Sequence, residues 1–250
     1  NLGGADERIT QIEEGAKLSS PLFAPLNVVV LQRIDDAAEP LDMTALPLFG
    51  LPDSDFLSFP DRPGLMTKRE VRVQVLAELA LQPAQVIWDI GAGTGSVSIE
   101  IARLCPGSRV YAVEKTAIGF HLIAKNCQRF QVTNVTPIQG TAPAALVSLP
   151  APDRIFIGGS GGNLTEILNI CAQKLSVNGH MVLALATFEH LTTALAWAEE
   201  MGRNGAAGGK WIQRVLQVQL ARSVPLAGLT RLAPLNPVTL LVLEKRGWLG

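Results

Sequence analysis

Three glycines and one acidic residue stand together at the point where a predicted strand runs into a predicted helix. The apolar strand Val86–Ile90 contains Asp89 and is followed by Gly91, Gly93 and Gly95. Glycines at such a turn allow backbone N–H groups to approach a ligand that a Cβ atom would keep away. The third glycine comes one residue earlier than in the Gly-x-Gly-x-x-Gly loop that binds the pyrophosphate of dinucleotides. This spacing favours a ligand that carries an amino acid group instead.

A loop of this kind is typical of the S-adenosylmethionine (SAM) site of Rossmann-like methyltransferases. In that interpretation Asp89 lies near the ammonium group of SAM, and Thr94 belongs to the same loop. Glu114 ends the next predicted strand, 25 residues after Asp89, where a carboxylate can accept hydrogen bonds from both ribose hydroxyls. A tight turn that binds nothing and a solvated acid at a strand end are the alternative interpretations.

Two more turns follow strands of the same predicted sheet. The segment Gly140–Ala142 comes after the third strand, where an adenine ring could lie against the backbone. The segment Gly158–Gly162 holds four glycines, and so open a loop either passes close to a ligand, moves when one binds, or is simply flexible. Ligands of open α/β sheets bind at the carboxyl ends of the strands. The predicted cofactor contacts are therefore Thr67, Asp89, Gly91, Gly93, Thr94, Gly95, Glu114, Gly140, Thr141, Ala142, Gly158 and Gly159.

The elements that must position these residues alternate between strands and helices from residue 64 onward, as in βα units. A leading helix is expected over Thr67–Ala80, with Thr67 and Glu70 as a capping box. We expect a Rossmann-like α/β fold with a mostly parallel seven-stranded sheet and a C-terminal antiparallel hairpin. The predicted strands are Val86–Ile90, Arg109–Glu114, Val135–Gln139, Arg154–Ile157, His180–Ala186, Trp211–Leu220 and Val238–Lys245, and the helices between them are Gly95–Leu104, Thr116–Phe130, Ala142–Ser148, Leu164–Leu175 and Phe188–Met201.

The composition excludes several classes of protein. A chain of 250 residues with 48% hydrophobic content can bury a full core, and its net charge of −1 offers no basic surface to nucleic acid. Cys105, Cys127 and Cys171 lie far apart, so they lack metal-ligand spacing and suit the thiols of a reducing compartment. No apolar run is long enough to cross a bilayer. We expect a soluble cytoplasmic protein without a metal, nucleic-acid or membrane partner.

The first 63 residues do not show the alternation of strands and helices. Asn27–Leu31 is a single strand-like run, and residues 37–63 are rich in Pro and Asp, a composition typical of a linker. One strand cannot form a core of its own. We expect this segment to pack on another domain or to remain mobile.

Several stretches besides the glycine loop carry a resemblance to a known family. They are Leu65–Arg72, Phe156–Gly162 and Ala221–Gly228. Together they resemble the decarboxylating precorrin C15-methyltransferases of cobalamin biosynthesis, over about residues 60–250. The stretches Asn1–Ile9 and Pro25–Val30 resemble the end of a C5-methyltransferase, a tetrapyrrole methylase that precedes the C15 half in fused precorrin-6Y C(5,15)-methyltransferases.

The resemblance divides the chain into three parts and implies a reaction. Residues 1–36 would be the remnant of the C5-methyltransferase domain, residues 37–63 the linker, and residues 64–250 the SAM-dependent C15-methyltransferase domain. The family implies methyl transfer from SAM to C15 of a precorrin, with loss of CO2 from the acetate chain on C12. It also implies a homotetramer and a C5-methyltransferase domain fused upstream.

The acceptor would carry several carboxylates, so cationic side chains should surround the mouth of the site. Methyl transfer to an electron-rich ring carbon can rest on alignment, without a conspicuous catalytic residue. Glu189 and His190, after the fifth strand, are candidates for proton transfer in the decarboxylation, although an acid there can simply open its helix. The predicted substrate contacts are Lys68, Arg69, Ser160, Arg222 and Arg231, and solvated surface charge is the alternative for each.

Two other functions are compatible with the same residues. The chain could be a SAM-dependent methyltransferase for another small molecule, a protein or RNA, although RNA is disfavoured by the lack of a basic stripe. It could also be a non-catalytic module that binds a partner methylase through the C-terminal hairpin. Loss of acceptor binding on removal of the charges of Arg222 and Arg231 would favour a polycarboxylate acceptor. Failure to bind SAM would favour the module.

Overall fold

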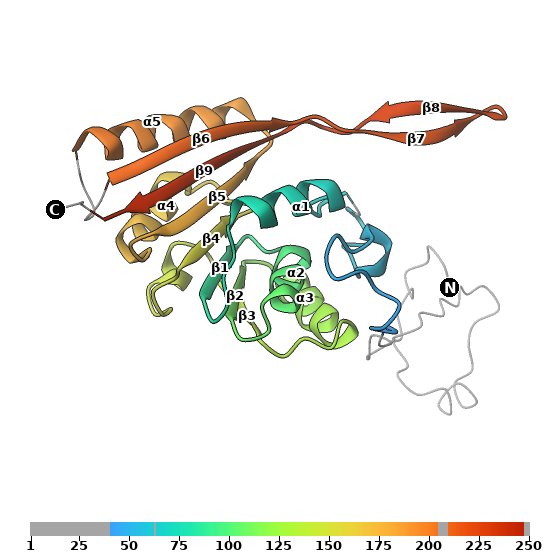
Figure 1. The fold of residues 1–250 in the computed structure, drawn as a ribbon, viewed down its shortest axis with the longest axis horizontal. Helices are drawn as coiled ribbons and strands as arrows, with labels where there is room; N and C mark the ends of the chain where they lie inside the picture. The colour runs from blue at the N-terminus through green and yellow to red at the C-terminus, as the bar shows by residue number, and fades with distance from the viewer. Residues whose placement is uncertain (1–40, 63, 205–209, 248–250) are drawn as a thin grey trace, which may run out of the picture. The chain divides into compact units, whose positions relative to one another are not determined.

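The computed structural model describes residues 41–62, 64–204 and 210–247, all of which belong to one compact unit, Ala37–Gly250 (Figure 1). The predicted C5-methyltransferase remnant, residues 1–36, lies outside the described residues. Within the described ranges, no helix combines the length and the apolar character needed to span a bilayer.

The centre of this unit is a mostly parallel sheet. Seven of the described strands pair in the order β3-β2-β1-β4-β5-β9-β6, with antiparallel pairing only for β5 with β9 and β9 with β6. The predicted Rossmann-like sheet with an antiparallel C-terminal pair is therefore confirmed. Strand order reverses between β1 and β4, which makes this edge the topological switch point. The strands are β1 (Val86–Ile90), β2 (Arg109–Glu114), β3 (Val135–Gln139), β4 (Arg154–Ile157), β5 (Gly179–Leu185), β6 (Lys210–Val218) and β9 (Val238–Arg246).

Helices cover both faces of the sheet, because strand side chains alternate between two apolar cores. Along β1, Trp88 and Ile90 join one core with α4 and α5, whereas Ile87 joins the other with α1, α2 and α3 (Figure 1). The helix predicted over Ala142–Ser148 is only a short 3-10 turn, Ala144–Leu146. The helices are α1 (Arg69–Glu78), α2 (Ser96–Leu104), α3 (Ala117–Arg129), α4 (Leu164–Lys174) and α5 (Phe188–Asn204), and the 3-10 turns are η2 (Asp53–Asp55) and η3 (Ala144–Leu146).

The first helix begins two residues later than the sequence predicts. α1 starts at Arg69 with Lys68 as its N-cap, and the side chain of Lys68 forms no capping bond. Asp53 supplies the cap from a distant segment, because its Oδ1 accepts a hydrogen bond from the backbone N–H of Arg69 at 2.9 Å. The predicted capping box of Thr67 and Glu70 is therefore wrong.

The stretch predicted as a linker packs into the domain over its described part. Leu51, Phe56 and Phe59 are at most 5% exposed, and the first two belong to the core that α1 covers. Burial of these side chains fixes the chain to the domain, although the Pro and Asp content around them is typical of a loop. The structure therefore differs from the predicted linker 37–63 over residues 41–62.

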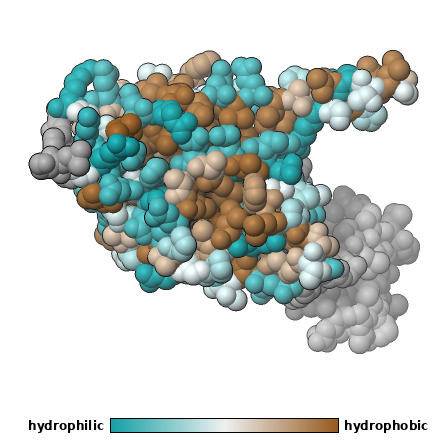
Figure 2. All heavy atoms as spheres, viewed as in Figure 1, coloured by the Kyte–Doolittle hydropathy of each residue, from teal (hydrophilic) through white to brown (hydrophobic). Residues whose placement is uncertain are grey.

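A second, two-stranded sheet extends from the end of β6 and returns to β9 (Figure 1). β7 (Ala221–Leu226) pairs with β8 (Leu229–Pro234), and Ala227 and Gly228 turn the chain between them with positive φ. The sequence predicts only a loop here, because Pro225 and Gly228 are typical of turns. Hydrophobic side chains of this hairpin face solvent (Figure 2), among them Leu226, Leu229 and Leu232, which are 53%, 74% and 69% exposed.

Candidate functional site

A cavity of about 480 Å³ lies at the carboxyl ends of β1 to β4, where the predicted turns converge. The loops that follow these strands form one side of it, and the segment from Phe59 to Thr67 forms another. Ten of the twelve predicted cofactor contacts line the cavity. They are Thr67, Gly91, Gly93, Thr94, Glu114, Gly140, Thr141, Ala142, Gly158 and Gly159.

The loop after β1 touches the loop after β4 backbone to backbone. A Cβ atom on Gly91 would lie 2.5 Å from the carbonyl oxygen of Gly159, and Gly91 has a φ of +71°. Both observations require glycine at this position. The N–H groups of Gly91 and Ala92 donate to the carbonyl of Val113 at 2.9 and 3.1 Å, which fixes the loop against β2. The floor of the cavity is thus made of tightly packed backbone.

Glu114 is held at the cavity by three donors. Its Oε2 accepts from the N–H of Gly93 at 3.1 Å, and its Oε1 accepts from the N–H and the hydroxyl of Thr116 at 2.9 and 2.8 Å. Thr116 in turn caps α3 by accepting from the N–H of Gly119. A carboxylate can accept about four hydrogen bonds, so Glu114 has capacity left for a ligand.

Thr94 lines the same cavity and has a buried hydroxyl without a partner among the described residues. The residue is 1% exposed, and its Oγ1 has no hydrogen-bond partner among the described residues. Its carbonyl accepts from Nδ2 of the buried Asn126 at 2.9 Å, and this amide also pairs with the N–H and carbonyl of Leu57 at 2.8 and 3.0 Å. A buried hydroxyl without a partner is rare unless a ligand or water completes it.

Asp89 does not line the cavity, contrary to the predicted contact with an ammonium group. It is wholly buried, and its Oδ2 accepts from the N–H and Oγ of Ser98 at 3.1 and 2.5 Å. Burial raises the pKa of Asp89 to about 6, the bonds from Ser98 oppose the rise, and the nearby charge of Glu114 adds to it. Asp89 therefore joins β1 to α2 behind the loop.

Gly95 is the second predicted cofactor contact that lies outside the cavity. It is the N-cap of α2, with a φ of +77°. A Cβ atom at this position would lie 3.2 Å from the side chain of Ile123 on α3. The third glycine of the loop is thus required by the turn and by close helix packing.

The predicted substrate contacts mostly lie elsewhere, and only Ser160 of the five lines the cavity. Lys68 caps α1 with its backbone. Arg69 donates from Nε to the carbonyl of Gly50 at 2.6 Å. Arg231 lies exposed on β8. Three of the predicted cations are therefore not arranged around the cavity mouth.

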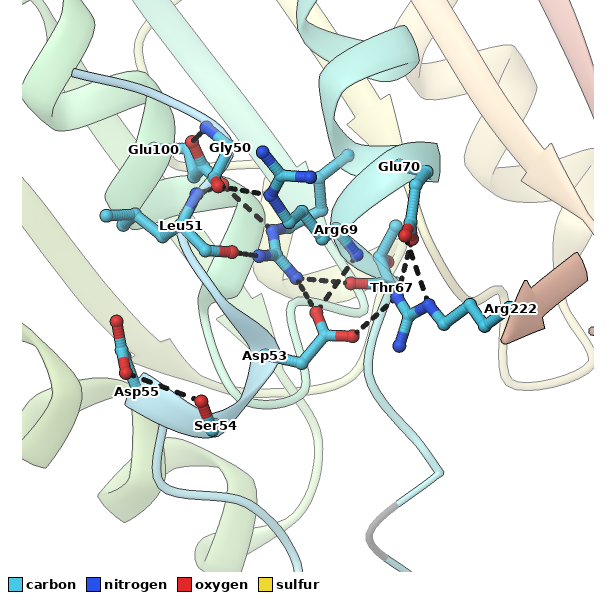
Figure 3. Close-up of polar contacts among 11 residues, drawn as sticks. Gly50, Leu51, Asp53, Ser54, Asp55, Thr67, Arg69, Glu70, Glu100 and Arg222 are labelled. Atoms are coloured by element: carbon cyan, nitrogen blue, oxygen red, sulfur yellow. Dashed lines mark hydrogen bonds and ion pairs between the residues drawn. The ribbon is translucent and has the colours of Figure 1, made fainter. Parts of the chain in front are cut away.

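Arg222 is engaged by two carboxylates (Figure 3). Its Nη2 lies 2.5 Å from Oε2 of Glu70 and 3.1 Å from Oδ2 of Asp53, and its Nε donates to Oε1 of Glu70 at 3.0 Å. These bonds raise the pKa of Arg222, and the bond from Arg222 lowers the pKa of Glu70. Two of the three guanidinium nitrogens, Nε and Nη2, are therefore engaged by carboxylates of the domain.

Two cations that the sequence prediction missed do line the cavity, Arg62 and Lys115. Lys115 directly follows Glu114 at the end of β2, a position from which it could have been predicted. Arg62 falls in the stretch interpreted as a linker, where nothing in the local sequence indicates a site. Its guanidinium lies 5.6 Å from the ring centre of Phe59 and pairs with Asp61 at 3.0 Å.

Glu189 and His190, the candidates for proton transfer, do not line the cavity. Both lie exposed in the first turn of α5. The N–H of His190 donates to Oγ1 of Thr187 at 3.4 Å, which is a weak contact at the start of the helix. The structure thus does not bring either residue to the cavity.

Comparison with known proteins matches residues 59–245 to the precorrin methyltransferase domain family. A Sinorhizobium protein named precorrin-6Y C(5,15)-methyltransferase (decarboxylating) is 33% identical over 239 residues, which are 95% of this chain and 53% of that protein. The chain thus spans about half the length of this relative. A Pyrobaculum aerophilum protein named probable cobalt-precorrin-6B C(15)-methyltransferase (decarboxylating) is 35% identical over 191 residues, which are 76% of this chain and 92% of that protein.

A solved structure shares the architecture as well as the sequence. The crystal structure of precorrin-6y C5,15-methyltransferase from Geobacter metallireducens superposes with a TM-score of 0.73 at 36% identity, covering 80% of this chain and all of that one. The matched family domain contains every residue that lines the cavity. The chain therefore belongs to the precorrin methyltransferase family and has the Rossmann-like fold of class I SAM-dependent methyltransferases.

Proposed function

We propose that this chain is a SAM-dependent methyltransferase of cobalamin biosynthesis that methylates C15 of a precorrin and removes CO2 from the acetate chain on C12. The observation that carries the proposal is the cavity beside Glu114, formed by the glycine loop of a precorrin methyltransferase domain. Relatives from Pyrobaculum aerophilum and Salmonella typhimurium are named C(15)-methyltransferases (decarboxylating), which supports the position of methylation and the loss of CO2.

SAM would be held by the ten predicted contacts that line the cavity. Glu114 has acceptor capacity for the ribose hydroxyls, and the unpartnered hydroxyl of Thr94 would gain a partner. The turns Gly140–Ala142 and Gly158–Gly159 would leave room along the adenine and the amino acid group. Bound SAM supplies an electrophilic methyl group on its sulfonium.

Catalysis would then depend on alignment, because neither Glu189 nor His190, the predicted candidates for proton transfer, is among the described residues that line the cavity. The close contact of Gly91 with Gly159 and the hydrogen bonds that Glu114 accepts from both Gly93 and Thr116 give a rigid cradle. Such a cradle can hold the acceptor carbon in line with the methyl group, which is a large source of rate enhancement. The electron pair left by CO2 would pass into the conjugated ring of the acceptor.

Lys115 and Arg62 are proposed as the cations that meet the acceptor's carboxylates. Nζ of Lys115 lies 3.5 Å from the position of a Cβ atom on Gly161, so it reaches across to the loop after β4. Lys115 forms no ion pair with the carboxylates of the described residues, and Arg62 pairs with the well-exposed Asp61. An exposed ion pair such as that of Arg62 with Asp61 is weak. Both cations are therefore free to pair with a carboxylate of the substrate.

The partners and location belong to the same proposal. The Sinorhizobium relative, about twice as long as the part matched here, supports a C5-methyltransferase domain as the partner. The exposed leucines of the β7–β8 hairpin support assembly of copies of the chain into a homotetramer. The free cysteines, of which Cys127 and Cys171 are buried, support a reducing compartment such as the cytoplasm.

Mass spectrometry of the reaction product tests the proposed function directly. The full chain is incubated with SAM and a C5-methylated precorrin, in metal-free and cobalt-containing forms. We expect a product that has gained one methyl group and lost one CO2 with at least one form. Binding of SAM without any product would indicate another acceptor, and a chain that binds no SAM in calorimetry would overturn the proposal.

A further inference from the structure

The β7–β8 hairpin is tied to the rest of the domain by one arginine. Among the described residues, the hydrogen bonds and ion pairs from the hairpin strands to other elements all come from Arg222, which reaches Glu70 on α1 and Asp53 on η2 (Figure 3). Its side chain is 40% exposed, against 18% for Asp53. The contact therefore lies at the boundary between solvent and core.

Asp53 connects Arg222 to residues inside the domain, because its two carboxylate oxygens accept hydrogen bonds from different partners. Oδ2 takes the bond from Arg222, while Oδ1 accepts from Nη1 of Arg72 at 2.7 Å and from the N–H of Arg69 at 2.9 Å. The rotation of this single carboxylate is thus set by the hairpin on one side and by α1 on the other. A shift of Arg222 must move or unpair one of these bonds.

Arg72 connects Asp53 to the wall of the cavity. Its side chain is fully buried, and Nη1 donates at 2.7 Å to the carbonyl of Thr67, a residue that lines the cavity. Nε donates at 3.1 Å to the buried carboxylate of Glu100 on α2, the helix that begins at the glycine loop. The guanidinium is planar and its donors point in fixed directions, so its orientation fixes that of the Thr67 carbonyl.

We infer that Arg222 is a positioning residue for the SAM site, which it orders through Asp53, Arg72 and the carbonyl of Thr67. The inference rests on the proposed function, because it takes the cavity to be the SAM site. It assigns to Arg222 a role different from the predicted contact with substrate. The position of the hairpin then determines how firmly the Thr67 segment of the cavity wall is held in place.

The affinity for SAM tests this role in the full chain. Arg222→Gln should raise the dissociation constant of SAM on the order of 5-fold, the lower range of couplings between separate sites. Arg203→Gln is the matched control, since Arg203 forms an equally short 2.5 Å pair with Glu199 on α5, which contributes nothing to the cavity lining. Equal affinities of the two variants in calorimetry would overturn the inference.

The charge and geometry of the contact of Arg222 with Glu70 and Asp53 give a second test of the positioning role. Arg222→Lys keeps the charge but loses the two-pronged geometry, so it should restore only part of the affinity. High salt should raise the SAM dissociation constant of the unmodified chain towards that of Arg222→Gln, because the pair is partly exposed. A side chain that only stabilised the fold would show neither pattern at temperatures where all variants are folded.

Hydrogen exchange separates this inference from the proposed function. In Arg222→Gln the backbone amides of residues 65–72 should exchange faster than in Arg203→Gln, without any ligand present. Unchanged exchange in this segment would contradict the coupling. If the unmodified chain bound no SAM, the proposed function would fail, and the exchange measurement would still decide whether the hairpin orders the wall.

Discussion

Glu114 and Asp89 are two carboxylates of the same sheet edge with different surroundings. Glu114 lines the cavity and accepts from Gly93 and Thr116, whereas Asp89 is sealed behind the loop with Ser98 as its partner. Both were predictable as acids near the carboxyl ends of strands. Their different surroundings were not predictable, because helices cover both faces of the sheet and the sequence does not show which of them covers a given strand side chain.

Removal of the charge of Glu114 should weaken the binding of SAM. Glu114→Gln replaces one acceptor oxygen by an NH2 group, which cannot accept from Gly93 or Thr116 or from a ribose hydroxyl. We expect the dissociation constant to rise by about 10- to 100-fold, the range of one or two charge-assisted hydrogen bonds. Calorimetry would measure it, with Glu166→Gln on the exposed side of α4 as control. Unchanged affinity would exclude Glu114 from the cofactor site.

Asp89 should make the stability of the fold depend on pH. Its pKa is about 6 in the folded chain, against an ordinary value of 3.8 for an aspartate, so the folded state holds the proton more tightly. The ionised form therefore costs stability, and this cost grows as the pH rises from about 4 to about 6. Asp89→Asn should remove the cost and gain on the order of 2 kcal/mol relative to the unmodified chain between those limits.

Urea unfolding at pH 4.5 and 7.5 would measure this difference. Asp61→Asn, which removes an exposed carboxylate, serves as the control for the change in net charge. A stability difference between Asp89→Asn and the unmodified chain that is the same at both pH values would contradict the role given to burial.

At the scale of elements, hydrophobic periodicity was sufficient to find the sheet and its helices. The strands Val86–Ile90 and Val135–Gln139 have the predicted bounds because apolar runs between turn residues leave few other choices. The start of α1 was missed because its cap, Asp53, comes from 16 residues upstream. Caps and anchors supplied by distant segments leave no mark in a local pattern.

Leu51 should show that residues 41–62 belong to the folded domain. Leu51→Ala removes a side chain that is 0% exposed in the core under α1, and we expect a loss of about 2–5 kcal/mol. Leu48→Ala, at a side chain that is 67% exposed, should change stability by less than about 0.5 kcal/mol. Denaturant unfolding would measure both, and similar small losses would mean that the segment is only a spacer.

Because of the contact between the loops after β1 and β4, alanine substitutions of Gly91 and Gly159 should have different effects. Gly91→Ala forces a Cβ atom to within 2.5 Å of Gly159 and demands a φ of +71°, so both stability and SAM affinity should fall, the latter by more than about 10-fold. Gly159→Ala meets no atom within 4 Å and should leave the melting temperature unchanged. Equal melting temperatures for the two variants would contradict the observed loop contact.

At the scale of the whole molecule, the structure brings most of the predicted cofactor contacts to one cavity but few of the predicted substrate contacts. Ten of the twelve predicted cofactor contacts line the cavity, and all of these except Thr67 lie at or directly after the carboxyl ends of parallel strands, which topology brings together. The cations depend instead on tertiary contacts. Arg222 was expected at the mouth but is held by Glu70, while Arg62 lines the cavity from a segment without a recognisable motif.

The hairpin should determine the mass of the assembly in solution. Leu229→Asp places a charge on a side chain that is 74% exposed in one chain and that we propose to be covered by another copy. Light scattering after gel filtration should then report a mass near the 26.7 kDa of a single chain. Ile118→Asp, at an exposed position on α3, should leave the assembly intact. A mass that is the same in both variants would exclude the hairpin as the interface.

Arg72 and Glu100 should limit which substitutions this sequence can accept during evolution. Both side chains are fully buried, and loss of either charge breaks their buried ion pair, at a cost of about 3–5 kcal/mol, although Arg72 would keep its pair with Asp53. Loss of Glu100 would also strip the N–H groups of Gly50 and Leu51 of their acceptor. Such a loss is a large part of the stability of an ordinary domain. Descendants of this chain should therefore inherit the two residues as a unit, and lineages that replace one alone should be rare.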